Sequence, residues 1–557
     1  MNQNTSFNLV DEPWVRIRDE GGRAHEVSLL ELFEQAPHIK CLANDLPTQD
    51  FAILRVLLAI LQRAILPAVE EDDDPAEVWG DLWNADELPI SDIRAYLDEW
   101  RYRFDLFDKE RPFMQVAGLR TEKDEISSIK KIVADVPDGD VLFSLRSGKG
   151  AESLSYSEAA RWLIHAQAFD TSGIKSGTVG DLRVKRGKSY PIGTGWAGGI
   201  GGLFFEGSTL FETLLLNFIV RDSDDGMFSA DDIPSWERPA EVAGSDERFP
   251  TGKLDLYTWQ SRRIRLIPKD DRVVGVVLTN GDKLESRNLY RYEPMTAWRR
   301  SLTQEKKLKQ SPVYLPLTHQ PGRALWRGLD SIFGKNTEED IPSIIKPELE
   351  DWISYLASRE GGQQLNQRYL LKAHAVGFEY GTQSSVITNL IDDKVELSAF
   401  LLSHEGESLV TLAKDCAAST SDAINALGIF AGNLIKATGS SDDNQIRGAK
   451  QDSQAQAFFE VDSPFRLWLA GLDESSDAKT ERAQWRQSAR QIISRRAYQL
   501  LRESSSDAIV GSPIRDKKEK IKEWMTASLA DARFNAALKK ALPLEEDIKE
   551  TKEEEVH

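Results

Sequence analysis

The spacing of apolar and polar positions changes near residue 395. From there to the C-terminus, apolar residues recur every three or four positions, which is typical of amphipathic helices. Four such stretches, separated by short polar linkers, lie at 407–437, 452–472, 483–503 and 520–542. Four long amphipathic helices in series predict an antiparallel four-helix bundle.

The first two thirds of the chain show a mixed pattern. A short strand is predicted over 7–19, and helices are predicted at 28–36, 48–68, 91–106 and 156–168. Residues 255–286 are rich in strand-forming residues, and Asn280-Gly281 between apolar stretches predicts a hairpin turn there. The predicted fold class is therefore α+β, with a large mixed α/β domain over 1–394 followed by the four-helix bundle over 395–557.

The composition agrees with a folded, multidomain protein. The chain has 557 residues, of which 40% are hydrophobic and 9% aromatic, enough apolar material for more than one core. The two cysteines, Cys41 and Cys416, lie far apart, which excludes a disulfide framework or a cysteine-based zinc site. The first residues contain no apolar run after a basic segment, so we expect no secretory signal there. The apolar stretches 51–66 and 210–220 are too short or too charged to span a membrane. We therefore expect a cytoplasmic protein with no membrane partner.

The charge pattern bears on possible partners. A formal net charge of −20 argues against a free-standing nucleic-acid binder, which usually has a basic face. The charge is patchy, however, because 175–188 and 299–309 each hold five cations against one acid. Acidic residues gather instead at 70–74, at 222–225 and in the C-terminal tail. Each basic run, considered alone, is more simply interpreted as a solvated surface.

No string in the chain predicts catalysis. Gly193-x-Gly195-x-x-Gly198 matches the dinucleotide fingerprint, but Pro191 lies just before it and no clear strand leads into it, so we expect a loop. The acidic string 222–226 breaks the spacing of a calcium loop. None of the seven histidines has a histidine or cysteine at a metal-ligand spacing, and neither a nucleophile elbow nor a Walker loop occurs. The sequence therefore predicts no metal, no cofactor and no catalytic residue.

Several strings, in order, resemble the CasA family, the large subunit of the type I-E CRISPR Cascade complex. Phe7–Trp14 resembles the family's opening strand, Arg111–Gln115 its HPFMQ element, Ser172–Gly177 its segment ending in F-K-S-G, and Leu214–Asn217 the helix that follows. With the helical C-terminus, the resemblance covers nearly the whole chain. It implies a non-catalytic subunit that recognises the PAM in double-stranded target DNA and helps open the duplex for pairing with the crRNA. The implied partners also include the other Cascade subunits and a helicase-nuclease effector that the subunit recruits.

The resemblance also assigns residues to the DNA contact. The family's glycine loop, which lets the backbone approach the minor groove, matches Phe169, Asp170, Thr171, Ser172 and Gly173, although only one glycine remains. The family's glutamine wedge, which presses on the first base pair, matches Gln383 in a predicted turn. The family's lysine finger, carried on a β-hairpin, matches 288–293, which holds no lysine. Arg291 is the candidate there, since a narrow minor groove attracts arginine.

Two further contacts follow from the resemblance. The loop with Phe143, Ser144, Leu145 and Arg146 matches the family loop that docks near the crRNA 5′ end and the adjacent subunit. In the bundle, the candidates for phosphate contacts are Arg447, Lys450, Arg495 and Arg496.

Other interpretations remain open at this stage. Without the family, loop 169–173 is an ordinary turn and Gln383 an exposed loop residue. A metal-dependent nuclease or hydrolase built from the acidic clusters is a different class of function, and a structural bundle protein without a DNA role is a third. The acidic clusters lie in polar, turn-like runs rather than at strand ends, which disfavours the hydrolase.

Overall fold

The computed structural model describes residues 5–70, 73–135, 152–220, 231–244, 247–335, 341–515, 520–544 and 547. The chain divides into two compact units. The first unit consists of Met1–Arg323, Asp330–Gln367 and Leu371–Lys394, and the second of Ala324–Leu329, Arg368–Leu370 and Val395–His557. Helices and sheets mix in the first unit and long helices dominate the second, which confirms the predicted α+β class.

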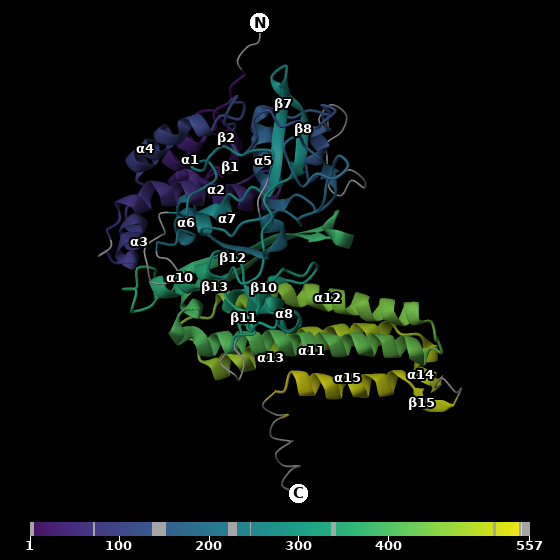
Figure 1. The fold of residues 1–557 in the computed structure, drawn as a ribbon. Helices are drawn as coiled ribbons and strands as arrows, with labels where there is room; N and C mark the ends of the chain where they lie inside the picture. The colour runs from purple at the N-terminus through teal and green to yellow at the C-terminus, as the bar shows by residue number, and fades with distance from the viewer. Residues whose placement is uncertain are drawn as a thin grey trace. The chain divides into compact units, whose positions relative to one another are not determined.

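Helix α2 (Pro47–Ile65) lies at the centre of the first unit, where it packs against α4 (Ile90–Trp100), α5 (Tyr156–Phe169) and α7 (Lys253–Tyr257) (Figure 1). Its side chains are buried on nearly every face, as expected for a helix that is apolar all round. In the described part of the chain, Pro47–Ala68 alone is long and apolar enough to cross a membrane, but 72% of its most apolar window is buried inside the protein. The predicted helices at 48–68, 91–106 and 156–168 are thus confirmed.

A buried ion pair fixes α2 within this unit. Arg55 donates two hydrogen bonds of 2.8 Å to the carboxylate of Glu293, and the two side chains are 2% and 0% exposed. The indole of Trp196 and the backbone N–H of Met295 donate to the same carboxylate. Because a buried charge is tolerated only when its hydrogen bonds are satisfied, these donors hold the 196 and 293 segments against α2.

A three-stranded sheet in the order β13 (Ile387–Ser398), β12 (Leu370–Tyr380) and β6 (Gly202–Glu206) carries the longest hairpin of the chain. His374 on β12 joins all three strands, because its ring nitrogens lie 2.7 Å from Glu206 Oε1 and 2.7 Å from Asp392 Oδ1. Burial lowers the pKa of His374, but the two hydrogen-bonded carboxylates outweigh burial and raise the pKa above 6.5.

A second hairpin corrects the predicted turn at Asn280-Gly281. Strands β7 (Arg262–Lys269) and β8 (Arg272–Asn280) turn at Asp270-Asp271, where φ is 51° and 57°, and Asn280 pairs with Arg262 at the open end (Figure 1). Two positive φ angles suit the twist of a two-residue hairpin, and aspartate tolerates them. The prediction was wrong because Gly281 serves close packing instead, since a Cβ there would lie 2.3 Å from the carbonyl oxygen of Gln260.

The remaining elements of the first unit are short. The predicted N-terminal strand begins only at Val15, in a sheet of order β2-β1-β3, and helix α1 follows β2. Their bounds are β1 Val15–Asp19, β2 Ala24–Val27, α1 Leu29–Glu34 and β3 Ile39–Leu42. Further elements are α3 (Pro75–Asn84), α6 (Leu210–Leu216), α8 (Leu302–Leu308), α9 (Asp330–Phe333), α10 (Glu348–Ala357) and a sheet of β10 (Tyr314–Pro316), β9 (Trp298–Arg300) and β11 (Ile344–Ile345).

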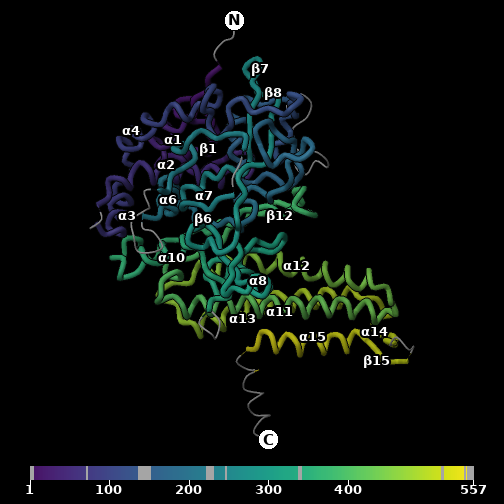
Figure 2. Tube along the Cα trace, viewed as in Figure 1, coloured from purple at the N-terminus to yellow at the C-terminus, as the bar shows by residue number. Residues whose placement is uncertain are grey.

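The four predicted bundle helices are confirmed in the second unit. They are α11 (Glu407–Ala437), α12 (Asp443–Ala470), α13 (Ala478–Glu503) and α15 (Ala527–Ala541), and α11 packs against the other three (Figure 2). The core includes Trp485, whose indole donates a 2.9 Å hydrogen bond to Thr420 Oγ1.

The start of the last helix differs from the prediction. Ile521–Met525 is a strand, β15, paired with β14 (Ser512–Arg515), and a short helix α14 (Ser506–Val510) precedes the pair. The helix begins only after Thr526, whose hydroxyl accepts a hydrogen bond from the N–H of Leu529 as an N-cap.

Candidate nucleic-acid interface

The predicted DNA-contacting loop 169–173 begins at the C-terminal end of α5. Phe169 is the last helical residue, and its side chain is buried, with its ring centroid 5.2 Å from that of His165. Ser172 is also largely buried, whereas Thr171 and Gly173 are half-buried. A Cβ built on Gly173 would meet no atom within 4 Å. Phe169 therefore anchors the loop, and the backbone around Gly173 is its accessible part.

Arg262, the first residue of β7, holds this loop in place through its side chain. Its guanidinium is fully buried and pairs with the carboxylate of Asp170. It also donates to three loop carbonyl oxygens, at 3.2 Å to Asp170, 3.1 Å to Thr171 and 2.8 Å to Gly193. A guanidinium offers five N–H donors in a rigid fork, so a single side chain fixes two separate loops.

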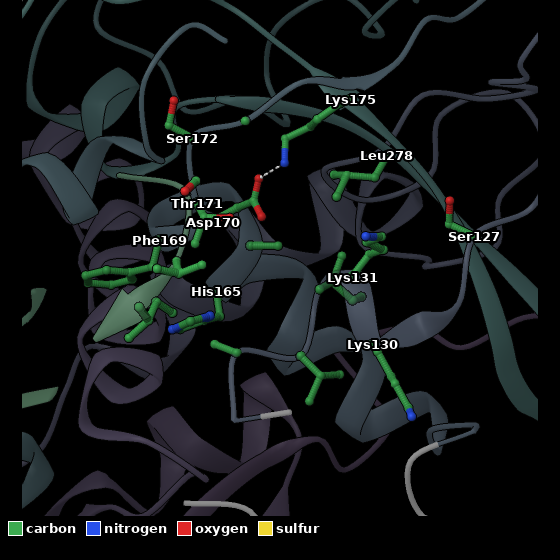
Figure 3. A pocket seen from close by; sticks show the side chains of 18 of the residues that line it. Ser127, Lys130, Lys131, His165, Phe169, Asp170, Thr171, Ser172, Lys175 and Leu278 are labelled. Carbon is green, nitrogen blue, oxygen red and sulfur yellow. Dashed lines mark ion pairs between the residues drawn. The ribbon is translucent and has the colours of Figure 1, made fainter. Parts of the chain in front are cut away.

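Lys175 completes the pairing of Asp170. Its Nζ lies 2.6 Å from Asp170 Oδ2 (Figure 3). Burial raises the pKa of the Asp170 carboxyl, but the charges of Lys175 and Arg262 outweigh burial and hold the pKa below its ordinary value. Burial also lowers the pKa of Lys175, and the paired Asp170 only partly opposes it. The carboxylate is therefore a structural anchor rather than a free acid.

The glycine string at 193–198 contacts the loop; it is irregular up to Gly195, as predicted, and continues as a 3₁₀ turn over Trp196–Gly199. Gly195 donates its N–H to the carbonyl oxygen of Asp170 at 2.9 Å, and a Cβ on Gly195 would lie 2.4 Å from the backbone of Ala168. Gly193 has φ of 110°, a conformation that side chains rarely adopt. Gly195 thus allows two backbones to pack closely, and a Cβ on Gly198 would lie 2.2 Å from the hydroxyl oxygen of Tyr380, so the glycines serve packing rather than a dinucleotide.

The structure brings the predicted wedge next to the loop. Gln383 lies in the turn between β12 and β13, is exposed, and has φ of 56° and ψ of 21°. The N–H of Ser172 donates to the carbonyl oxygen of Ser384 at 2.8 Å, and the hydroxyl of Tyr380 donates to the carbonyl oxygen of Phe169 at 2.7 Å. The loop and the turn are therefore held together at two points, although they lie more than 200 residues apart in sequence.

A cavity of about 410 Å³ opens beside the loop (Figure 3). Residues 169–176 form one wall, a 3₁₀ turn over Ile129–Lys131 forms another, and 385–387 of the hairpin close the side. Lys130 and Lys131 line it as well. His165 lies at its base, where burial lowers the pKa of the imidazole to about 3 and Thr48 shares a 3.0 Å hydrogen bond with it. The histidine is thus neutral and adds no charge to the cavity.

The other predicted contacts lie elsewhere or cannot be placed. Arg291 is exposed on a turn closed by the carbonyl oxygen of Leu289, not on a β-hairpin, and it does not line the cavity. The loop residues Phe143, Ser144, Leu145 and Arg146 lie outside the described residues. Each of these contacts stays a prediction.

The four bundle cations lie on two helices. Arg447 and Lys450 are exposed on α12. On α13, Arg495 is 64% exposed and forms an ion pair of 3.3 Å with Glu460, and Arg496 is half-buried and donates to Gln499. Their contact with phosphates stays a prediction.

Two residues of this site were missed from the sequence. Arg262 lies in a strand with the sequence RRIRLIPK, so no local signal separates its buried guanidinium from the neighbouring cations. Tyr380 carried no signal either, because a tyrosine before a turn glycine is common in strands. Among the described residues, no group of three or more histidines, cysteines and carboxylates is placed to hold a metal ion.

Comparisons with known proteins agree with this architecture. The family model of CRISPR-associated protein Cse1 matches residues 8–496. A CRISPR-associated protein CasA/Cse1 from Thermus thermophilus is 28% identical over 427 residues, which cover 74% of this chain and 78% of that protein. The crystal structure of Cse1 from Thermobifida fusca is 42% identical with a TM-score of 0.86, covering 97% of this chain and 98% of that one. A chain in a solved CRISPR RNA-guided surveillance complex, 18% identical, shares the fold with a TM-score of 0.65 over 89% of this chain and 99% of its own. This chain therefore belongs to the CRISPR-associated protein Cse1 family.

Proposed function

We propose that this chain is the large subunit of a cytoplasmic CRISPR RNA-guided surveillance complex, in which it recognises the PAM, helps open the duplex and recruits a helicase-nuclease. The observation that carries the proposal is the hydrogen bond between Ser172 and Ser384, which joins loop 169–173 to the turn of Gln383. Recognition of the PAM and opening of the duplex take place at adjacent base pairs, so loop 169–173 and the turn of Gln383 have to be neighbours.

The chemistry of each element suits its proposed role. A Cβ built on Gly173 would meet no atom within 4 Å, so the space beside this residue is open and the floor of a groove can approach the main chain there. The backbone of Gln383 is held in a left-handed conformation at the tip of a hairpin, so its side chain starts from a defined position. Inserting a side chain beneath a base pair costs a few kcal/mol of unstacking, which a fixed wedge offsets better than a mobile one.

The wedge is tested by Gln383→Ala in the assembled complex with crRNA. We expect complex assembly to be unchanged and R-loop formation on a PAM-bearing duplex to slow. Gln363→Ala is a matched control, because Gln363 is likewise an exposed glutamine at positive φ, here 54°. Equal R-loop rates for the two variants would contradict the wedge.

The loop is tested at Gly173 because the fold tolerates a side chain there. In the series Gly173→Ala and Gly173→Leu, the melting temperature should stay constant, while affinity for PAM-bearing duplex falls with side-chain size. Ser172 is less suitable, since its burial makes a large replacement disturb the fold. If affinity for duplexes with and without the PAM fell by the same factor, the loop would not be the reader.

The rival function is a metal-dependent nuclease. In the acidic cluster 70–74, the Asp74 carboxylate accepts a hydrogen bond from the N–H of Ala76 as the N-cap of α3, and the Asp73 carboxylate accepts one from the N–H of Glu70. These carboxylates therefore organise a turn. The clusters at 222–225 and in the tail lie outside the described residues, apart from Asp547. Incubating the pure protein with DNA and Mg²⁺ or Mn²⁺ decides between the functions, because strong metal-dependent cleavage would overturn the non-catalytic proposal.

A further inference from the structure

The basic run that follows the loop forms a small, tightly turned hairpin. Strand β4 (Lys175–Ser176) pairs with β5 (Lys188–Ser189). Beyond it, Lys185 and Lys188 exchange two backbone hydrogen bonds of 3.0 and 3.1 Å around Arg186 and Gly187, whose φ angles are 54° and 72°. A two-residue loop with both φ angles positive is the favoured turn of a β-hairpin. The side chains at this end are therefore presented from an ordered backbone.

The five cations of this run divide into two groups. Lys175 pairs with Asp170, and Arg183 pairs with Asp181 at 3.3 Å. The side chains of Lys185, Arg186 and Lys188 are exposed and form no ion pair or hydrogen bond with the described residues. We call these three residues the basic turn. In a chain with a net charge of −20, three adjacent cations without an acidic partner concentrate positive potential at one place.

The basic turn lies within a short distance of the loop. Ser176 follows Gly173 by three residues, so their Cα atoms are at most about 11 Å apart at roughly 3.6 Å per residue. Ser176 pairs with Lys188, and paired strands lie about 4.8 Å apart. The Cα of Lys188 is thus within about 16 Å of the Cα of Gly173, and a long cationic side chain shortens the remaining gap.

The basic turn is close enough to the loop to contact the same duplex. The minor groove is about 6 Å wide. Duplex DNA carries one negative charge for about every 1.7 Å of its axis. A duplex whose groove rests on Gly173 and whose axis runs toward Lys188 therefore has phosphates within about 16 Å of Gly173, near the basic turn.

We propose that the basic turn is a second contact for double-stranded DNA, which holds backbone phosphates beside the PAM without reading sequence. The proposal rests on the proposed function, because the loop brings the duplex to this place. Phosphate contacts from lysine and arginine position a protein on DNA and contribute a salt-dependent affinity.

The test replaces the basic turn by neutral polar residues, Lys185→Gln, Arg186→Asn and Lys188→Gln. Asparagine is chosen at 186 because it tolerates positive φ. The affinity of the assembled complex is measured against salt, on one duplex with a PAM and one without. The slope of log affinity against log salt should become shallower by about 0.9 for each phosphate that is no longer bound. If the affinity at 1 M salt is unchanged, the affinity at 0.1 M salt then falls about eightfold for each such phosphate. Both duplexes should lose affinity by the same factor.

A matched control removes the same charge elsewhere in the first unit. Lys306→Gln, Lys307→Gln and Lys309→Asn on and after α8 neutralise three exposed lysines, and Lys309 also has positive φ, 55°. The salt slope of this control should equal that of the unaltered complex. Equal changes in both triple variants would show that only net charge matters, and would overturn the proposal.

Two further outcomes separate this proposal from the function on which it rests. A change in the ratio of affinities with and without the PAM would overturn a sequence-independent contact at the basic turn. Loss of crRNA from the purified complex, with duplex affinity per loaded complex unchanged, would assign the basic turn to RNA and also overturn it. If the basic turn behaves as expected while Gly173→Leu and Gln383→Ala have no effect, the phosphate contact stands and the proposed reading and opening roles fail.

Discussion

Replacing Arg262 by methionine tests whether the loop is fixed before any DNA arrives. The substitution keeps a long apolar stem and removes the guanidinium. Asp170 then keeps only Lys175 as its cation, and three loop carbonyl oxygens lose a donor. Removing one partner of a buried ion pair costs about 3–5 kcal/mol, because the other charge stays buried.

This cost should appear as opening of the loop rather than as unfolding of the whole chain. The side-chain contacts of Arg262 reach Asp170, Thr171 and Gly193, all in irregular segments, whereas the backbone pairing of β7 with β8, from Arg262 to Lys269, does not depend on the guanidinium. At about 1.4 kcal/mol for each factor of ten, the open population should rise by roughly two to three and a half orders of magnitude.

Hydrogen exchange at the amide of Ser172 measures this opening directly, since that N–H is bonded to the carbonyl oxygen of Ser384. Arg265→Met is the matched control on the same strand, because Arg265 donates one hydrogen bond, at 3.2 Å, to the carbonyl oxygen of Leu119. We expect fast exchange at Ser172 only in the Arg262 variant. If the Ser172 amide exchanged at the same rate in both variants, Arg262 would not be the residue that holds loop 169–173 in place.

Three further predictions concern the cores and the sheet. His374 has a raised pKa, so the stability that its charged bridge contributes is fully present below pH 6.5 and is lost as the pH rises through the folded pKa. Exchange protection of β12 should therefore fall as the pH is raised above 6.5 in the natural protein and stay level in His374→Gln. Arg55→Met should lower the free energy of unfolding of the first unit by about 3–5 kcal/mol, measured in urea, and adding Glu293→Gln should recover part of that loss. An unchanged free energy of unfolding in Arg55→Met would contradict this role of the ion pair. Trp485→Phe should lower the stability of the second unit by about 1–3 kcal/mol, because the buried Thr420 hydroxyl loses its donor; an unchanged midpoint would contradict this.

The helices of this protein are legible in its sequence because their signals are local. Apolar residues recur every three or four positions over 407–437, and they dominate 48–68. Each of these stretches forms one helix in the structure. The hairpin turn was misplaced because Asn280-Gly281 has the preferred turn residues, whereas the true turn uses two aspartates. Gly281 is needed for its lack of a side chain against the 260–262 backbone, and that requirement depends on a tertiary contact that no local pattern encodes.

The candidate site was less predictable than the fold, for the same reason. The family resemblance pointed to loop 169–173 and to Gln383, but it did not show that Phe169 is a core residue. Arg262 and Tyr380, which hold the loop by hydrogen bonds, lie far from it in sequence, so their role is apparent only in the folded chain. A basic run such as 175–188 could be noted from its letters, but only the structure separates its paired cations from the three of the basic turn.

The fastening of the loop also limits what it can offer to DNA. The carbonyl oxygens of Asp170 and Thr171 are occupied by Arg262, and the N–H of Ser172 by Ser384. The N–H groups of Thr171 and Gly173 form no hydrogen bond with the described residues. The minor groove presents acceptors at every base pair and a donor only at guanine. If the loop meets a minor groove as proposed, its free N–H donors suit those acceptors at any base pair. Discrimination would then have to come from the remaining carbonyl oxygens of Ser172 and Gly173, which can accept from the guanine amino group.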